Sequence, residues 1–109
     1  MFQQGDIYKV NLNPISGHEQ GNYRPVLIIS RNDIPLPGGL KIVIPITSQK
    51  HGFALEFALP QEMTTTGYAL PFHVRSLDLH QRNAKFIEHA PKDFIEKCCV
   101  ITSQLFDIT

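Results

Sequence analysis

The chain has 109 residues, which indicates one domain over residues 1–109 rather than two. Its hydrophobic fraction of 42% allows a packed core, and ten basic and ten acidic residues give a formal net charge of zero. Such a balance excludes a protein that coats nucleic acid through bulk charge, although a local basic patch is compatible with it.

The N-terminus and the two cysteines bear on compartment and metals. No basic region precedes an apolar run, so we expect no signal peptide, no transmembrane span and a cytoplasmic location. Cys98 and Cys99 are adjacent, where a disulfide would be strained, and they fit small core-filling roles in a reducing compartment. Without a second Cys pair or a His at zinc-finger spacing, the sequence predicts no metal site, and we expect no cofactor.

Two strands are expected in the first thirty residues. Apolar residues roughly alternate over residues 6–12, which predicts a strand that ends at Asn13 and Pro14. The polar, glycine-bearing stretch 16–22 reads as a loop. The continuous apolar run 26–29 is typical of a strand that is buried on both faces.

The middle of the chain alternates turns with further strands. Prolines and glycines over residues 35–39 predict a loop, and residues 41–46 predict a strand in which Pro45 lies near an edge or a bulge. Residues 53–59 alternate apolar and other side chains as a strand does, and residues 67–79 read as a further extended stretch.

The last third ends in a helix. Residues 85–88 predict a short strand, and Pro91 suits the first position of a helix. Apolar residues then recur at three- and four-residue steps, which predicts an amphipathic helix over residues 91–106. Many short strands followed by one helix favour a mainly β protein, a small half-open β-barrel with a C-terminal helix.

The stretch from residue 17 to residue 26 is the first candidate site. His18 and Glu19 are titratable groups on an exposed loop, and Arg24 directly precedes a buried strand. Pro25 fixes the backbone beside this arginine, and a guanidinium held in this way suits an anion such as a phosphate. The alternative is a polar loop whose arginine forms a salt bridge.

Two further stretches carry candidate groups. Thr47 ends a predicted strand, and its hydroxyl could donate to a phosphate oxygen or make ordinary strand-end hydrogen bonds. His73 and Arg75 point to one face if their segment is a strand, which could follow an RNA backbone or be a solvated polar face.

Together these groups suggest metal-independent cleavage of RNA. The 2′-hydroxyl of RNA can attack the adjacent phosphorus if a base accepts its proton, a cation stabilises the phosphorane and an acid protonates the departing 5′ oxygen. An arginine, a hydroxyl and a His or Glu suffice for these roles. The sequence lacks the paired Asp/Glu/His clusters of metal nucleases.

Six motifs in register over nearly the whole chain resemble the MazF/PemK toxin family. They are residues 5–8 (GDIY), 11–14 (NLNP), 17–20 (GHEQ), 24–27 (RPVL), 45–48 (PITS) and 74–78 (VRSLD). The resemblance implies an SH3-like half-open barrel (MazF/PemK/CcdB-like), a homodimer, and the toxin of a type II toxin–antitoxin pair. It also implies sequence-selective cutting of single-stranded RNA that leaves 2′,3′-cyclic phosphate and 5′-hydroxyl ends, and a MazE/PemI-like antitoxin whose tail lies over the RNA groove.

The resemblance also assigns roles to residues. Arg24 matches the family arginine that stabilises the transition state or protonates the leaving oxygen, and Thr47 matches the threonine that contacts the scissile phosphate. His18 and Glu19 match the neighbouring mobile loop and complete the predicted catalytic set. The predicted RNA-contacting residues are Arg75, His73, Gln20, Ser48 and Phe72.

One departure from the family keeps two alternatives open. Kid-like toxins use an Arg and an Asp at the positions that Leu70 and Phe72 occupy here. Phe72 could instead stack on a base, or fill the barrel or the dimer interface. The missing Arg/Asp pair supports the alternative of a degenerate relative that only dimerises and binds an antitoxin. A second alternative, a CcdB-like protein that binds gyrase, follows from the fold that the resemblance implies.

Overall fold

The computed structural model describes residues 1–14, 17–19 and 21–108. Seven strands, three short 3₁₀ helices and one α-helix follow one another along this part of the chain. The strands are β1 (Asp6–Asn11), β2 (Tyr23–Ile28), β3 (Lys41–Thr47), β4 (Phe57–Ala58), β5 (Tyr68–Ala69), β6 (Arg75–Leu77) and β7 (Lys85–His89). The helices are η1 (Pro37–Gly39), η2 (Pro71–His73), η3 (Leu79–Gln81) and α1 (Lys92–Gln104).

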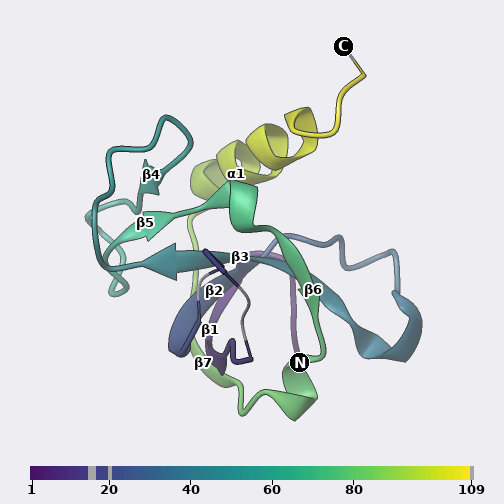
Figure 1. The fold of residues 1–109 in the computed structure, drawn as a ribbon. Helices are drawn as coiled ribbons and strands as arrows, with labels where there is room; N and C mark the ends of the chain where they lie inside the picture. Colours follow the sequence, from purple (N-terminus) through teal and green to yellow (C-terminus); the bar gives the residue numbers. More distant parts are fainter. Residues whose placement is uncertain (15–16, 20, 109) are drawn as a thin grey trace.

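The strands form one curved, entirely antiparallel sheet that remains open (Figure 1). Their order is β4-β5-β3-β2-β1-β7, and β6 pairs with β3 beside β5. The long strand β3 therefore has β2 along one side and both β5 and β6 along the other. This arrangement, closed by a C-terminal helix, confirms the predicted half-open barrel.

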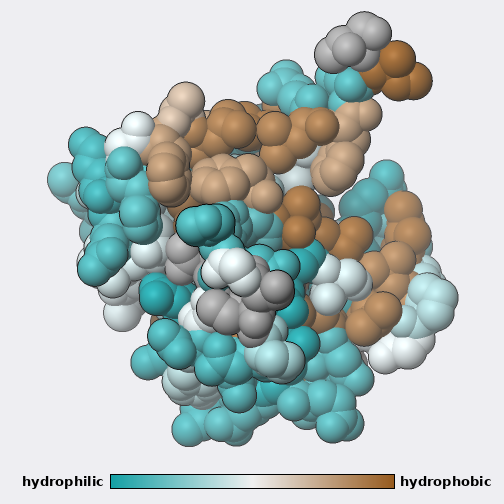
Figure 2. All heavy atoms as spheres, viewed as in Figure 1, coloured by the Kyte–Doolittle hydropathy of each residue, from teal (hydrophilic) through white to brown (hydrophobic). Residues whose placement is uncertain are grey.

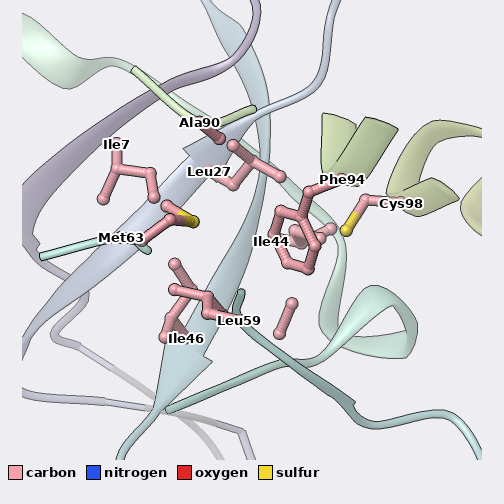
Figure 3. Packing of buried hydrophobic residues seen from close by; sticks show 10 residues of the cluster. Ile7, Leu27, Ile44, Ile46, Leu59, Met63, Ala90, Phe94 and Cys98 are labelled. Carbon is pink, nitrogen blue, oxygen red and sulfur yellow. The ribbon is translucent and has the colours of Figure 1, made fainter. Parts of the chain in front are cut away.

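Both faces of the sheet are buried. Successive side chains of a strand point to opposite faces, so Ile7 packs into one cluster and Tyr8 into the other. The first cluster joins the sheet to α1, which contributes Phe94 and Cys98 (Figure 3). The second cluster contains Val10, Leu12, Val26, Ile28, Val43, Leu77 and Leu79.

Helix α1 begins after Pro91, whose extended backbone ends the preceding segment, and Asp93 lies in the first turn. Burial raises the pKa of the Cys98 thiol to about 12, which keeps it a neutral core group as expected. On its outer side α1 exposes apolar residues, which form a band over the helix in Figure 2. No helix in the part of the chain that the structure describes is long and apolar enough to cross a membrane.

Two of the sequence expectations need correction. The alternating stretch 53–59 forms a strand only at Phe57–Ala58, because the carboxylate of Glu56 turns back to accept hydrogen bonds from the backbone of His51 and Gly52. The extended stretch 67–79 is interrupted by the 3₁₀ helix Pro71–His73, which separates β5 from β6.

Pro45 occupies this same interruption. Its carbonyl oxygen accepts a hydrogen bond from the Leu70 amide, on the side of β3 that faces β5 and β6. The missing N–H of the proline therefore points to the gap between these two strands, where no ladder bond is lost. The prediction of an edge or a bulge located the irregularity correctly, although β3 is a central strand.

Candidate functional site

A cleft of about 590 Å³ opens beside the loop that follows β1. His18 and Glu19 line it from this loop, and Phe72, His73 and Arg75 line it from η2 and β6. Five predicted site residues, which come from two segments more than fifty positions apart in the sequence, thus meet at one cleft. The other lining residues are Leu12, Pro45, Val74 and Ser76.

The histidine at position 73 is tuned by its place in this cleft. Partial burial lowers the pKa of His73, nearby His51 acts in the same direction, and Glu19 acts against both. The imidazole is therefore neutral at neutral pH and able to accept a proton. The predicted strand face for His73 and Arg75 is replaced by a turn of 3₁₀ helix followed by β6, yet both residues border the same cleft.

The register of strands β2 and β3, extended beyond their last pair, brings Arg24 and Thr47 to opposite positions. Their antiparallel register pairs Val26 with Pro45, and the same register continued by two residues sets Arg24 opposite Thr47. Residues directly opposite in such a pair have Cβ atoms about 4.5–5.5 Å apart and share a face of the sheet. Pro45 lines the first cleft, whereas Arg24 lines the second cleft described below.

The guanidinium of Arg24 is held at the end of the preceding loop. It is half-buried, and its Nε donates to the carbonyl oxygen of Gly21 over 2.7 Å. This bond orients the fork, and an arginine side chain stays cationic at all physiological pH values. The predicted alternative of a structural salt bridge is not what holds Nε, because its partner is a backbone carbonyl.

A second cleft, of about 330 Å³, adjoins Arg24. Ser48 and the three consecutive threonines 64–66 provide hydroxyl groups around it, and Lys9 adds a cation. Hydroxyls, amides and cations together are the donor set that phosphate oxygens require. The remaining lining residues are Tyr23, Pro25, Ile46 and Ile87.

Glu88 on β7 fixes this threonine segment. Its carboxylate accepts hydrogen bonds from the Thr64 amide at 3.1 Å and from the Thr65 amide and hydroxyl at 2.5 and 2.6 Å. Desolvation acts to raise the pKa of Glu88, but the hydrogen bonds from Thr65 and Thr64 outweigh it and lower the pKa below the ordinary range. An ionised Glu88 therefore holds the wall of the second cleft.

Thr47 is buried between its neighbours, with 2% of its surface exposed. Its hydroxyl accepts a hydrogen bond from the Gln49 amide at 3.2 Å, which leaves the O–H free to donate. Gly67 packs against it so closely that a Cβ at that position would collide with the Thr47 carbonyl oxygen. Only glycine also adopts the φ of +128° found there at low cost.

The predicted residues thus fall into three places. His18, Glu19, Phe72, His73 and Arg75 surround the first cleft; Arg24 and Ser48 border the second; and Thr47 lies beneath the surface opposite Arg24. Gln20 lies outside the described residues.

The two residues that depart from the Kid-like pattern behave differently. Leu70 is fully buried, whereas Phe72 has 36% of its surface exposed at the rim of the first cleft. Phe72 therefore does not fill the barrel, and the two other predictions for this residue are that it stacks on a base or fills the dimer interface.

Several site residues had no signal of their own in the sequence. Glu88 and Thr65 meet from positions 23 residues apart. Phe53, which stacks on His51, contacts Phe72 from a segment that was expected to be a strand. The repeated threonines at 64–66 were the one local hint. Among residues 1–14, 17–19 and 21–108, no three His, Cys, Asp or Glu side chains form a group that could hold a metal ion.

Comparison with known proteins gives consistent matches over most of the chain. Residues 3–105 match the family of PemK-like, MazF-like toxins of type II toxin–antitoxin systems. The endoribonuclease toxin ChpB of Escherichia coli is 39% identical over 102 residues, which span 88% of this chain and 86% of ChpB.

The fold is also found in solved structures. MazF of Deinococcus radiodurans superimposes with a TM-score of 0.88 at 32% identity, covering 97% of this chain and 96% of that protein. A structure of the MazE–MazF complex from the same organism superimposes with a TM-score of 0.82 at 32% identity, covering 98% of this chain and 96% of the matched chain.

Proposed function

Since the chain belongs to the family of PemK-like, MazF-like toxins of type II toxin–antitoxin systems and is an endoribonuclease, we propose that it cuts single-stranded RNA at the ends of strands β2 and β3 without a metal ion. The observation that carries this proposal is the register of β2 and β3, whose continuation beyond the pair Val26–Pro45 sets Arg24 opposite Thr47, while Pro45 itself lines the His-lined cleft. A cation and a hydroxyl then flank one position, which is where the scissile phosphate lies.

The reaction begins at the 2′-hydroxyl of the RNA. A base in the first cleft accepts its proton, the 2′ oxygen bonds to the adjacent phosphorus, and the bond from phosphorus to the 5′ oxygen breaks. Arg24 and the Thr47 hydroxyl donate to the phosphorane oxygens, where charge develops, and such fixed donors lower the barrier most. A proton delivered to the departing 5′ oxygen completes 2′,3′-cyclic phosphate and 5′-hydroxyl ends.

Three groups in the first cleft have the chemistry of the proton acceptor. His18 and Glu19 are exposed on the loop that was predicted to contain it. His73 joins them, because burial lowers its pKa and so keeps a ring nitrogen free of a proton at neutral pH. We propose that the base is one of these three, and that Arg75 and Phe72 contact the RNA beside it.

The second cleft accommodates a neighbouring phosphate. Ser48, the threonines 64–66 and Lys9 surround it with donors, and Arg24 links it to the cutting site. RNA that crosses the strand ends from one cleft to the other would place successive phosphates on Arg24 and on these hydroxyls. Sequence selectivity then depends on how the loops receive unstacked bases.

The partners follow from the family. We propose that a MazE/PemI-like antitoxin restrains this chain, as the MazE–MazF complex of Deinococcus radiodurans illustrates for a relative, that the toxin is a homodimer, and that both act in the cytoplasm. The exposed apolar side chains at the end of α1 provide a surface that either protein partner could cover; they are Val100, Leu105 and Phe106.

RNA cleavage in EDTA with mapped ends tests the proposal. We expect cuts at a short recurring sequence, with 2′,3′-cyclic phosphate and 5′-hydroxyl ends. Cleavage that requires a divalent cation, or 5′-phosphate ends, would overturn the mechanism. Capture of gyrase without any RNA cleavage would support the CcdB-like alternative instead, and dimerisation with antitoxin binding alone would support the degenerate one.

A further inference from the structure

Four aromatic rings form a continuous array on the surface next to the first cleft. His51 and Phe53 stack in parallel, with centroids 5.0 Å apart and an interplanar angle of 1°. Phe53 meets Phe72 edge to face at 5.5 Å, and Phe72 meets His73 edge to face at 4.7 Å. We name these four residues the aromatic array.

The array is exposed although it is apolar. Phe53 has 49% and Phe72 36% of its surface open to solvent. Large rings at this level of exposure lose free energy to water unless a partner covers them. Single exposed apolar residues are common on protein surfaces, but these rings from two separate segments form one contiguous patch. Such a patch indicates a contact surface.

A carboxylate holds one end of the array in place. Glu56 accepts hydrogen bonds from the amides of His51 at 3.0 Å and Gly52 at 3.1 Å, so the backbone that carries His51 and Phe53 is tied before any ligand arrives. A preorganised surface does not lose loop entropy on binding. The other end is fixed by η2, which carries Phe72 and His73.

The neighbourhood of the array favours a nucleobase as its occupant. Phe72 and His73 also line the first cleft, and Arg75 and His18 in the same lining are groups that can bind a phosphate. In single-stranded RNA each flat base is joined through its sugar to a nearby phosphate. Proteins recognise such bases by stacking them on aromatic side chains.

We propose that Phe53 and Phe72 form a stacking platform that receives one unstacked base of the RNA next to the cut. This proposal rests on the proposed function, since it assigns a base subsite to the same RNA path. The platform selects the local sequence by how well each base stacks, whereas Arg24 and Thr47 act on the phosphate. His51 and His73 support the two phenylalanines from either side.

Fluorescence of 2-aminopurine tests the platform directly, because stacking on a ring quenches it. The probe is a 2′-O-methyl oligoribonucleotide, which binds without being cut, with 2-aminopurine placed in turn at each position around the mapped site. We expect strong quenching at one position. Phe53→Leu and Phe72→Leu should abolish it and weaken binding about ten-fold, since one base stack contributes about that factor or more.

Two variants control for other effects. Phe53→Tyr keeps a ring and should retain quenching. Phe86→Leu removes a ring that is 57% exposed on β7 and lies outside the array, and it should leave quenching and binding unchanged. Thermal unfolding should be the same for all variants because the rings that change are exposed.

The outcomes separate this proposal from the proposed function. RNA that is cut in EDTA while quenching persists in Phe53→Leu and Phe72→Leu would overturn the platform and leave the nuclease standing. RNA that is never cut, with quenching lost in both variants, would support the platform and overturn the nuclease. A changed oligomeric state or lost antitoxin binding with unaltered quenching would overturn the platform in favour of a protein interface.

Discussion

The groups proposed to stabilise the charge on the phosphate lie on strands, whereas the groups proposed for base contact lie on loops. The register of two central strands, extended beyond the pair Val26–Pro45, sets Arg24 opposite Thr47, and the backbone of Gly67 packs closely against the Thr47 carbonyl. Phe53 and Phe72 come from the β3–β4 connection and from η2, and both are exposed. This division assigns a fixed geometry to cleavage and leaves selectivity to segments that can change between relatives.

The comparison also explains how the two halves are stabilised. The strand-built half depends on close packing against buried backbone. The loop-built half depends on two carboxylates that accept backbone hydrogen bonds, Glu56 under the array and Glu88 under the threonine wall. The stability of the strand-built half should therefore depend on steric fit, and that of the loop-built half on charge and pH.

The largest expected effect is the loss of the arginine on the strand. Arg24→Ala should reduce the cleavage rate by about 10²–10³-fold, because a fixed cationic donor to the developing charge is removed. Single-turnover cleavage in EDTA measures it. Arg31→Ala is the matched control, because Arg31 forms an exposed ion pair with Asp33. This variant should cut at the wild-type rate. Equal loss in both variants would mean that net charge, not position, matters.

A methyl group at Gly67 should destabilise the strands around Thr47 more than a methyl group at Gly52 destabilises its loop. Gly67→Ala forces a Cβ against the Thr47 carbonyl at a φ of +128°, so we expect a loss of about 3 kcal/mol in the free energy of unfolding. Gly52→Ala also has positive φ but meets open space, and it should lose about 1 kcal/mol. Urea unfolding compares them, and equal losses would show that the close approach to Thr47 is unimportant.

The hydroxyl of Thr47 should matter more for rate than for stability. Thr47→Val removes the donor to the phosphate and the acceptor for the Gln49 amide, so cleavage should fall about ten-fold or more while unfolding loses only about 1 kcal/mol. Thr47→Ser should restore most of the rate. A Thr47→Ser enzyme that is as slow as Thr47→Val would show that the methyl group, not the hydroxyl, is required.

The smallest expected effect is the pH dependence of the stability that Glu88 provides to the segment of threonines 64–66. The hydrogen bonds from Thr65 and Thr64 hold the pKa of Glu88 below its ordinary value, so its contribution to stability is present above that value and is lost as the pH falls through the lowered pKa. Wild type should therefore exceed Glu88→Gln in stability at neutral pH, and the difference should shrink between about pH 5 and pH 3. A difference that grows in acid would contradict this sign.

Local patterns predicted the elements whose environment is uniform. Strands β1, β2, β3 and β7 and helix α1 were expected within a few residues of their bounds, because apolar periodicity reports burial along one element. The stretch 53–59 failed since Glu56 folds back on the backbone, and Phe53 alternates with its neighbours without being buried.

The site was predictable only where single segments carry it. Local sequence patterns were enough to select Arg24, which precedes Pro25, and Thr47, which ends a strand. The pairing of Phe53 with Phe72, and of Glu88 with Thr65, arises from segments about twenty residues apart that no local pattern links.

The most direct test of the account is a pair of RNA oligonucleotides that differ by one oxygen atom. Both carry the mapped cut sequence, and one lacks the 2′-hydroxyl at the nucleotide before the scissile phosphate. If that hydroxyl is the nucleophile, single-turnover assays in EDTA will show full cleavage of the first oligonucleotide and none of the second, with equal binding of both. Equal cleavage of the two would contradict attack by the RNA's own 2′-hydroxyl, and with it the roles given to Arg24 and Thr47.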